Sequence, residues 1–165
     1  MLTQERLKEL FHYDPDTGVF VRKVQTCNRV RQNGKAGSLH SSGYLTIRIG
    51  SKNYYAHRLA WFYTYGEWPN QVDHINHNRA DNRLCNLRSV TDAENRKNQT
   101  LRIDNKSGIC GVAWDKHYKK WKAHIRANGK AKTLGYFDNL FDAVCIRKSA
   151  EVKLGFHKNH GCVTA

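Results

Sequence analysis

The stretch that decides the reading of this chain is Asp-His-Ile-Asn-His-Asn-Arg-Ala-Asp-Asn-Arg, which occupies residues 73–83. It brings carboxylates, imidazoles, amides and guanidinium groups together in one short segment. The triplet Asn86-Leu87-Arg88 follows, and then the sequence Thr91-Asp92-Ala93-Glu94-Asn95. Thr91 and Glu94 have the spacing of a capping box, so we expect a helix that begins at Thr91 and carries Asn95 just past its first turn.

These residues supply the groups that phosphodiester hydrolysis requires. A hard cation must neutralise the charge that develops on the phosphate oxygens. Asp73 and Asn95 offer oxygen ligands of the kind that Mg²⁺ or Mn²⁺ prefers. A base with a pKa near neutrality must take a proton from the attacking water, and His74 can do so. The segment therefore predicts a metal-dependent nuclease centre; the alternative is an ordered loop of Asn and Asp turns.

Together with Ala56-His57-Arg58-Leu59-Ala60-Trp61, these motifs resemble the HNH endonucleases of phages and mobile introns over roughly residues 10–100. The resemblance implies a ββα-metal core over about residues 70–99: a strand with Asp73 and His74, a loop, a strand with Asn86, and a helix with Asn95. It implies that Asp73 and Asn95 bind one metal ion, Mg²⁺ or Mn²⁺, and that His74 is the general base.

The same resemblance gives Asn86 the task of hydrogen-bonding across the loop and orienting His74. Asn95 stands where many relatives have His, which implies a weakly held, oxygen-bound cation. Arginines in and around the core are candidate contacts to DNA phosphates, with surface ion pairing as the alternative for each: Arg58, Arg79, Arg83, Arg88 and Arg96.

A second module is expected behind a polar linker at residues 100–108. Strand-like runs cover residues 111–114, 120–126 and 132–137, an Asn128-Gly129 turn signals a hairpin, and a helix is predicted from about residue 140 to residue 154. Residues 120–126 alternate, with Trp121, Ala123 and Ile125 on an apolar face. Basic side chains on or beside the opposite face are candidate DNA contacts: Lys120, Lys122, His124, Arg126 and Lys132. The alternation alone leaves a solvated lysine-rich face equally open.

Residues 107–156 resemble the plant Apetala-type, ethylene-response-factor DNA-binding domain, through Ser107-Gly108, Gly111-Val112-x-Trp114-Asp115, Lys120-Trp121 and Leu134-Gly135-x-Phe137. This likeness implies that the basic face binds DNA. Cys110, Ala113 and Asp115 stand where that family has base-reading arginines, so the plant target sequence does not carry over. Trp114 is expected to pack against the helix in the core, and stacking toward DNA is the alternative.

The fold class expected is α+β, with a ββα-metal nuclease unit followed by a small three-stranded antiparallel sheet packed on one helix. The modules are predicted at residues 1–100 and 107–156. Upstream of the polar stretch we expect a helix capped by Thr3, a strand at residues 19–21, a basic loop at 22–43, a strand at 44–49 and a helix at 56–65 ended by Gly66.

Composition narrows the function further. The chain has 165 residues, and 28 Lys and Arg against 14 Asp and Glu give a net charge of +14, which favours a polyanion. The partner expected is double-stranded DNA, with no membrane segment and no required protein partner, for a monomer in the cytoplasm (the host cytoplasm if a phage encodes the chain). The five cysteines are scattered, so we expect reduced and mostly buried thiols. The rivals are a DNA-binding regulator without catalysis and an RNA-binding or RNA-cleaving protein, although no aromatic ladder for unpaired bases is evident.

Overall fold

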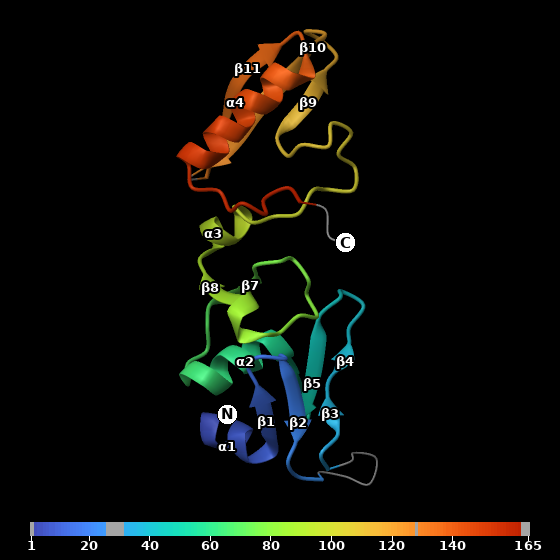
Figure 1. Cartoon of the computed structure of the whole chain (residues 1–165), viewed down its shortest axis with the longest axis vertical. Coiled ribbons are helices and arrows are strands. Elements are labelled where there is room, and N and C mark those ends of the chain that lie inside the picture. Colours follow the sequence, from blue (N-terminus) through green and yellow to red (C-terminus); the bar gives the residue numbers. More distant parts are fainter. Residues whose placement is uncertain (1, 26–31, 128, 163–165) are drawn as a thin grey trace. The chain divides into compact units, whose positions relative to one another are not determined.

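The computed structural model describes residues 2–25, 32–127 and 129–162 and divides the chain into two compact units, Met1–Val90 and Thr91–Ala165 (Figure 1). Both contain helices and small antiparallel sheets, in agreement with the mixed fold class predicted. The N-terminal unit contains, in order, α1 (Gln4–Leu10), β1 (Phe11–Asp14), β2 (Val19–Arg22), β3 (Lys35–Ala36), β4 (Ser38–Leu39), β5 (Leu45–Ile49), β6 (Lys52–Tyr55), α2 (Ala56–Tyr65), β7 (Gln71–His74), the 3-10 turn η1 (Leu84–Asn86) and β8 (Leu87–Val90).

Helices and hairpins of the N-terminal unit share one apolar core. Its largest fully buried side chains come from α1, β1, β2, β5 and α2: Leu7, Phe11, Phe20, Ile47 and Leu59. The predicted cap is confirmed, because the Thr3 side chain accepts a hydrogen bond from the Arg6 amide. Gly66 ends α2 in the left-handed conformation at φ 76°, as the sequence predicts.

Three small sheets complete this unit, with strand orders β1-β2-β3, β4-β5-β6 and β7-β8. The prediction of a loop over residues 22–43 is wrong for β3 and β4, which are two residues each and too short to show a period of two; residues 26–31 lie outside the described part. In the β7–β8 ribbon, His74 pairs with Leu87 and Asp73 pairs with Arg88. Because of this register, Asp73 and His74 lie opposite residues of β8.

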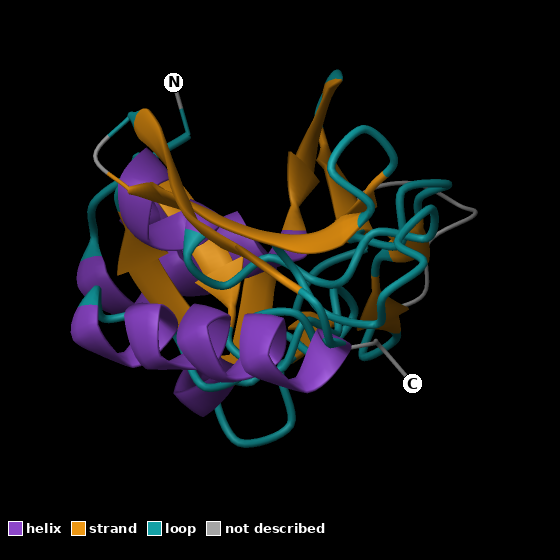
Figure 2. Ribbon diagram, turned by 90° about the horizontal axis from the view of Figure 1, so that it is seen from above, coloured by secondary structure: helices purple, strands orange, loops and turns teal. Residues whose placement is uncertain are grey.

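The C-terminal unit contains α3 (Asp92–Arg96), β9 (Val112–Asp115), β10 (Lys120–Ala127), β11 (Lys130–Phe137) and α4 (Leu140–Lys153). The sheet has the order β11-β10-β9, and α4 lies along one face of it (Figures 1 and 2). Val112, Ala123 and Ala143 form the buried centre. The predicted three strands and covering helix are thus confirmed, with Asn139 as the helix cap. Asn128 of the expected hairpin signal lies outside the described residues.

Two expectations about individual side chains are wrong. Trp114 is 48% exposed, because it lies on the edge strand β9, where its edge-to-face contact with Trp121 covers only part of the ring. The cysteines that the structure describes are free, as expected, but none is fully buried: Cys110 is half-buried, whereas Cys85, Cys145 and Cys162 are exposed. Cys27 is outside the described residues.

The segment expected to be a linker, residues 100–108, is hydrogen-bonded at its start to the C-terminal tail. Just before it, backbone amides of the C-terminal tail donate to the chain, His157 to the Lys97 carbonyl at 3.1 Å and Gly161 to the Gln99 carbonyl at 2.8 Å. The Leu101 amide donates in turn to the Cys162 carbonyl. Residues 97–101 therefore belong to the C-terminal unit, which begins at Thr91.

None of the helices in the described part of the chain is long and apolar enough to span a membrane.

Candidate active site

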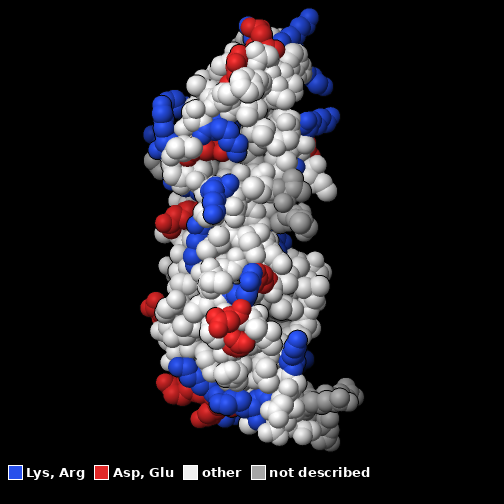
Figure 3. Space-filling view, in the orientation of Figure 1, with Lys and Arg blue, Asp and Glu red and all other residues white. Residues whose placement is uncertain are grey.

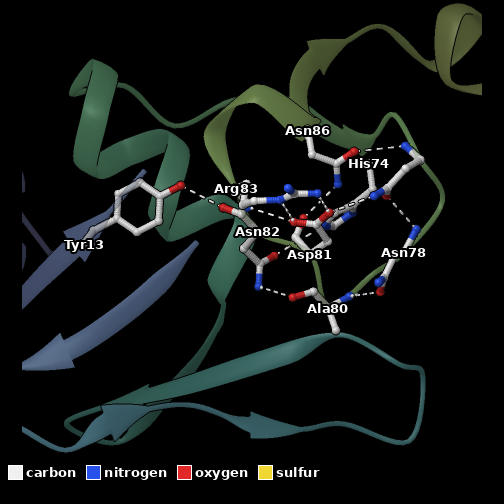
Figure 4. Close-up of polar contacts among 9 residues, drawn as sticks. Tyr13, His74, Asn78, Ala80, Asp81, Asn82, Arg83 and Asn86 are labelled. Atoms are coloured by element: carbon white, nitrogen blue, oxygen red, sulfur yellow. Dashed lines mark hydrogen bonds and ion pairs between the residues drawn. The ribbon is translucent and has the colours of Figure 1, made fainter. Parts of the chain in front are cut away.

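The site is built on the loop that joins β7 to η1, residues 75–83, which folds on its own polar side chains (Figure 4). The Asn76 side-chain oxygen accepts from the Asn78 amide, and the Asn78 oxygen accepts from the Ala80 amide. Asp81 accepts from Nε and Nη2 of Arg83 and from the side-chain Nδ2 of Asn76, and these hydrogen bonds lower the pKa of Asp81 to about 2. Successive Asx turns of this kind explain why the stretch is so rich in Asn and Asp.

His74 ends β7 and is 4% exposed. Its Nε2 lies 3.2 Å from Oδ1 of Asn82, and the Asn82 Nδ2 donates to the Ala80 carbonyl at 3.3 Å. Because the amide nitrogen is directed to Ala80, the amide oxygen is directed to His74, so Nε2 carries the hydrogen and Nδ1 the lone pair. Burial lowers the pKa of His74, which favours the neutral ring that a general base requires.

Asn82 is itself held from the N-terminal hairpin. It is 1% exposed, and its carbonyl accepts a hydrogen bond from the Tyr13 hydroxyl at 2.7 Å (Figure 4). Gly18, at φ +72°, lies against the same peptide: a Cβ there would be 2.4 Å from the Arg83 nitrogen. A left-handed turn without a side chain is therefore needed at residue 18. Sequence reasoning missed Asn82, because nothing in the local pattern sets it apart from Asn76 or Asn78.

Asn86 closes the loop as predicted. Its Oδ1 accepts from the Asn76 amide at 3.0 Å, and its Nδ2 donates to the Asp81 carbonyl at 2.8 Å. Asn86 lies in η1, directly before β8 and not within a strand. The hydrogen bond that the structure gives to the His74 ring comes from Asn82. Asn86 thus acts on the backbone of the loop, and a role in orienting His74 would be indirect.

Asp73 precedes His74 on β7 and faces its ladder partner. Arg88 donates to one oxygen of Asp73 from Nε at 3.1 Å and from Nη2 at 2.7 Å, and the Asp73 side chain is 10% exposed. A cation bound by this carboxylate would share it with Arg88 or displace the guanidinium. Within residues 2–25, 32–127 and 129–162, no three or more His, Cys, Asp or Glu side chains form a group that could hold a metal.

Asn95 belongs to the C-terminal unit and lies on α3. The capping box predicted there is confirmed: Thr91 accepts from the Glu94 amide, and Glu94 accepts from the Thr91 amide. The donors predicted for the metal are a carboxylate and an amide oxygen, a hard set that fits Mg²⁺ or Mn²⁺ better than Zn²⁺. That Asp73 and Asn95 share one ion stays a prediction.

A second histidine lies against His74, and it comes from the segment 56–61 that carries part of the resemblance. His57, in the first turn of α2, is 6% exposed, and its ring meets the His74 ring edge to face at 4.9 Å. Burial lowers the pKa of His57 to about 3, so this ring is neutral. Tyr44 and Tyr55 pack on it at 5.1 Å and 5.5 Å. One wall of the site is therefore aromatic and uncharged.

The candidate phosphate contacts of the nuclease region mostly have intramolecular partners. Arg58 donates to the carbonyls of Pro69 and Asn70, and Arg79 lies over the Tyr44 ring and donates to Ser42. Arg83 and Arg88 pair with carboxylates, whereas Arg96 is exposed on α3. Their contacts to DNA stay predictions.

In the C-terminal unit, His124 and Arg126 are exposed on β10, whereas the exposed Lys132 pairs with Ile125 across the ladder and lies on the α4 side of the sheet, not on the predicted basic face. Lys120 pairs with Asp138 at 3.1 Å, and Lys122 lies over the Tyr136 ring. On the face drawn in Figure 3, Lys and Arg side chains are spread over both units, with Asp and Glu interspersed among them. The structure thus leaves a basic strand face in the second unit, as the alternation of residues 120–126 predicts.

Residues 54–97 match the family model of the HNH endonucleases. The matched segment contains His57, Asp73, His74, Asn82 and Asn95, and it supports nuclease chemistry for this region. The chain is also 36% identical over 59 residues to Protein 3.8 of Escherichia phage T7, an alignment that covers 36% of this chain. The chain spans about half the length of that relative (49%). No solved structure is significantly similar to this chain. Since the family match ends at residue 97, the likeness of residues 107–156 to the Apetala-type domain stays a prediction.

Proposed function

We propose that this protein is a metal-dependent endonuclease of a phage or mobile element that hydrolyses phosphodiester bonds in double-stranded DNA. The observation that carries the proposal is the setting of His74: a buried ring whose Nε2 lies 3.2 Å from Oδ1 of Asn82, inside a segment that matches the HNH endonucleases. A buried histidine fixed in one tautomer is suited to accept a proton at the other nitrogen.

In this mechanism Nδ1 of His74 takes the proton of a water that attacks the scissile phosphorus, while Asn82 keeps the ring from turning. The charge that forms on the ring is stabilised by the neighbouring Asp73 carboxylate. Asp73 and Asn95 would hold a Mg²⁺ or Mn²⁺ ion, which neutralises charge on the phosphate oxygens when bound. Asn86 keeps the loop closed, and arginines around the site bind the flanking phosphates.

The C-terminal sheet is proposed as a second DNA contact, through Lys120, Lys122, His124, Arg126 and Lys132. Each phosphate that these side chains neutralise releases counterions, so binding should weaken steeply with salt. The chemistry requires no protein partner, and we propose a monomer that acts in the cytoplasm of the host cell.

The test is cleavage of supercoiled plasmid by the purified protein. Nicked or linear DNA should appear with Mg²⁺ or Mn²⁺, and EDTA should stop the reaction without unfolding the protein. Plasmid that stays supercoiled in both metals, or equal cleavage in EDTA, would contradict the proposal.

A DNA-binding regulator without catalysis is the second candidate. It is supported by the ion pair between Asp73 and Arg88, which gives the carboxylate a structural partner that needs no metal. Tight binding to DNA with no cleavage under the same conditions would favour this function.

A further inference from the structure

An open apolar groove lies in the C-terminal unit, between the second half of α4 and the hairpin end of β10 and β11. Its free volume is about 460 Å³, within the range of about 300–1,000 Å³ that is usual for binding pockets. Its apolar lining comes from both strands and from the helix: Ile125, Leu134, Ile146, Ala150 and Leu154. None of these residues belongs to the proposed nuclease centre.

The groove exists because α4 buries charge where a helix usually buries apolar side chains. Its buried residues are Ala143, Arg147 and Glu151. Arg147 pairs with Glu151 at 3.0 Å and donates to the carbonyls of Cys110 and His124. The aliphatic side chains beside this stripe are left at its edge, so Ile146 is 41% exposed and Leu154 is 37% exposed.

Exposed apolar surface lining a concave site is a mark of an interaction surface. Neither Ile146 nor Leu154 belongs to the core of this unit, which consists of Val112, Ala123 and Ala143 with the partly buried apolar side chains that pack on them. DNA phosphates would gain little from an aliphatic floor. The occupant must therefore bring apolar side chains of its own.

The charge at the groove decides between possible partners. Lys130, Lys132 and Lys153 line it together with the aliphatic residues, and no acidic side chain of the described residues does so. In a symmetric contact between two copies of the chain, these lysines would face the same lysines of the other copy and repel them. A partner that carries apolar side chains flanked by carboxylates would complement both the aliphatic lining of the groove and its three lysines. Charge complementarity of this kind steers association.

We propose that this groove binds an acidic amphipathic helix of a partner protein. Apolar side chains spaced i, i+3 or i+4 along that helix would fill the space over Ile125 and Ile146, and its Asp and Glu side chains would face Lys130, Lys132 and Lys153. The proposal is independent of the nuclease chemistry, because the groove shares no residue with the catalytic segment, although Lys132 is also one of the candidate DNA contacts.

The test is selection of a displayed random-peptide library on the immobilised full-length protein, followed by binding of the selected peptide in solution by fluorescence anisotropy. Selected sequences should carry net negative charge and apolar residues at helical spacing. Ile146→Asp should weaken binding by about tenfold or more, since it places a charge in the apolar centre of the interface. Lys132→Glu should weaken it as well.

Val152→Asp is the matched control, because Val152 is an 80% exposed aliphatic residue of the same helix that does not line the groove. It should bind the peptide as the wild type does, and thermal unfolding should show that all three variants are folded. Selection of no peptide, selection of peptides without this pattern, or equal binding by Ile146→Asp and the wild type would overturn the proposal. A dimer in sedimentation velocity that Ile146→Asp dissociates would assign the groove to a second copy and overturn it too.

Discussion

Replacing Asn82 by Leu tests how His74 is held. The substitution keeps the approximate volume of a side chain that is 1% exposed, but it removes the acceptor 3.2 Å from Nε2 of His74. A buried N–H left without an acceptor costs about 1–3 kcal/mol. At about 1.4 kcal/mol for each factor of ten in rate, this corresponds to a loss of roughly 5- to 150-fold. The loss arises because the ring either keeps an unsatisfied N–H or moves its hydrogen to Nδ1, the nitrogen that must accept a proton.

The assay is single-turnover cleavage of a labelled duplex with protein in excess, and DNA affinity is measured separately in EDTA. Asn78→Leu is the matched control: Asn78 is exposed in the same loop, and its side-chain oxygen accepts from the Ala80 amide. This variant loses one hydrogen bond within the loop but no contact to His74, so it should lose clearly less rate than Asn82→Leu. Asn82→Asp keeps an oxygen toward Nε2 and should cut faster than Asn82→Leu. Wild-type cleavage by a folded Asn82→Leu protein would refute this reasoning.

Three further predictions concern stability and DNA recognition. Because the pKa of His57 is lowered to about 3 in the fold, the unfolded state binds the proton first, and stability should fall as pH drops below about 6.5, by up to about 1.4 kcal/mol per pH unit. Urea unfolding measured between pH 7 and pH 5 should therefore show a smaller change of unfolding free energy with pH for His57→Phe than for the wild type. The same pH dependence in both proteins would contradict the lowered pKa. Gly111 has a φ of +75°, and Gly111→Ala would put a Cβ 2.4 Å from the His124 carbonyl oxygen. We therefore expect a loss of about 1–3 kcal/mol in the free energy of unfolding. An unchanged melting temperature would speak against the left-handed turn at residue 111. Arg126→Ala should relax sequence specificity at one or two base positions by about 1–3 kcal/mol. Lys122→Ala should instead lower the affinity for all DNA sequences alike and reduce the dependence of affinity on salt concentration. Competition binding at several salt concentrations separates the two effects, and identical effects of both variants would argue against a base-reading role for Arg126.

Much of the fold could be predicted because its signals are local. The cap at Thr3, the capping box at Thr91 and Glu94, and the glycine after α2 each act over one helical turn. The alternation of residues 45–49 and 120–126 follows from the pleat of a strand with one buried face. The order of Asp73, His74, Asn86 and Asn95 suggested a nuclease for the same reason, since these residues stand close together in the chain, and the family match over residues 54–97 supports that assignment.

The rest depends on contacts between distant residues. The hydroxyl of Tyr13 reaches the Asn82 carbonyl across 69 positions of sequence, and His57 meets His74 only because α2 packs beside β7. The charged residues of α4 look like a solvated face, yet Arg147 and Glu151 are buried as a pair. The tail at residues 157–162 has no periodic pattern, so its pairing with residues 97–101 could not be read from the sequence.

The central claim is that His74 is the base of a metal-dependent DNA cleavage reaction. The most direct measurement is the single-turnover cleavage rate of His74→Ala in Mg²⁺, relative to the wild type, at protein concentrations that saturate the DNA. We expect a loss of about 10²–10⁴ in rate with DNA affinity nearly unchanged, because the ring is buried and takes no part in holding phosphates. Cleavage by His74→Ala at the wild-type rate would contradict the claim.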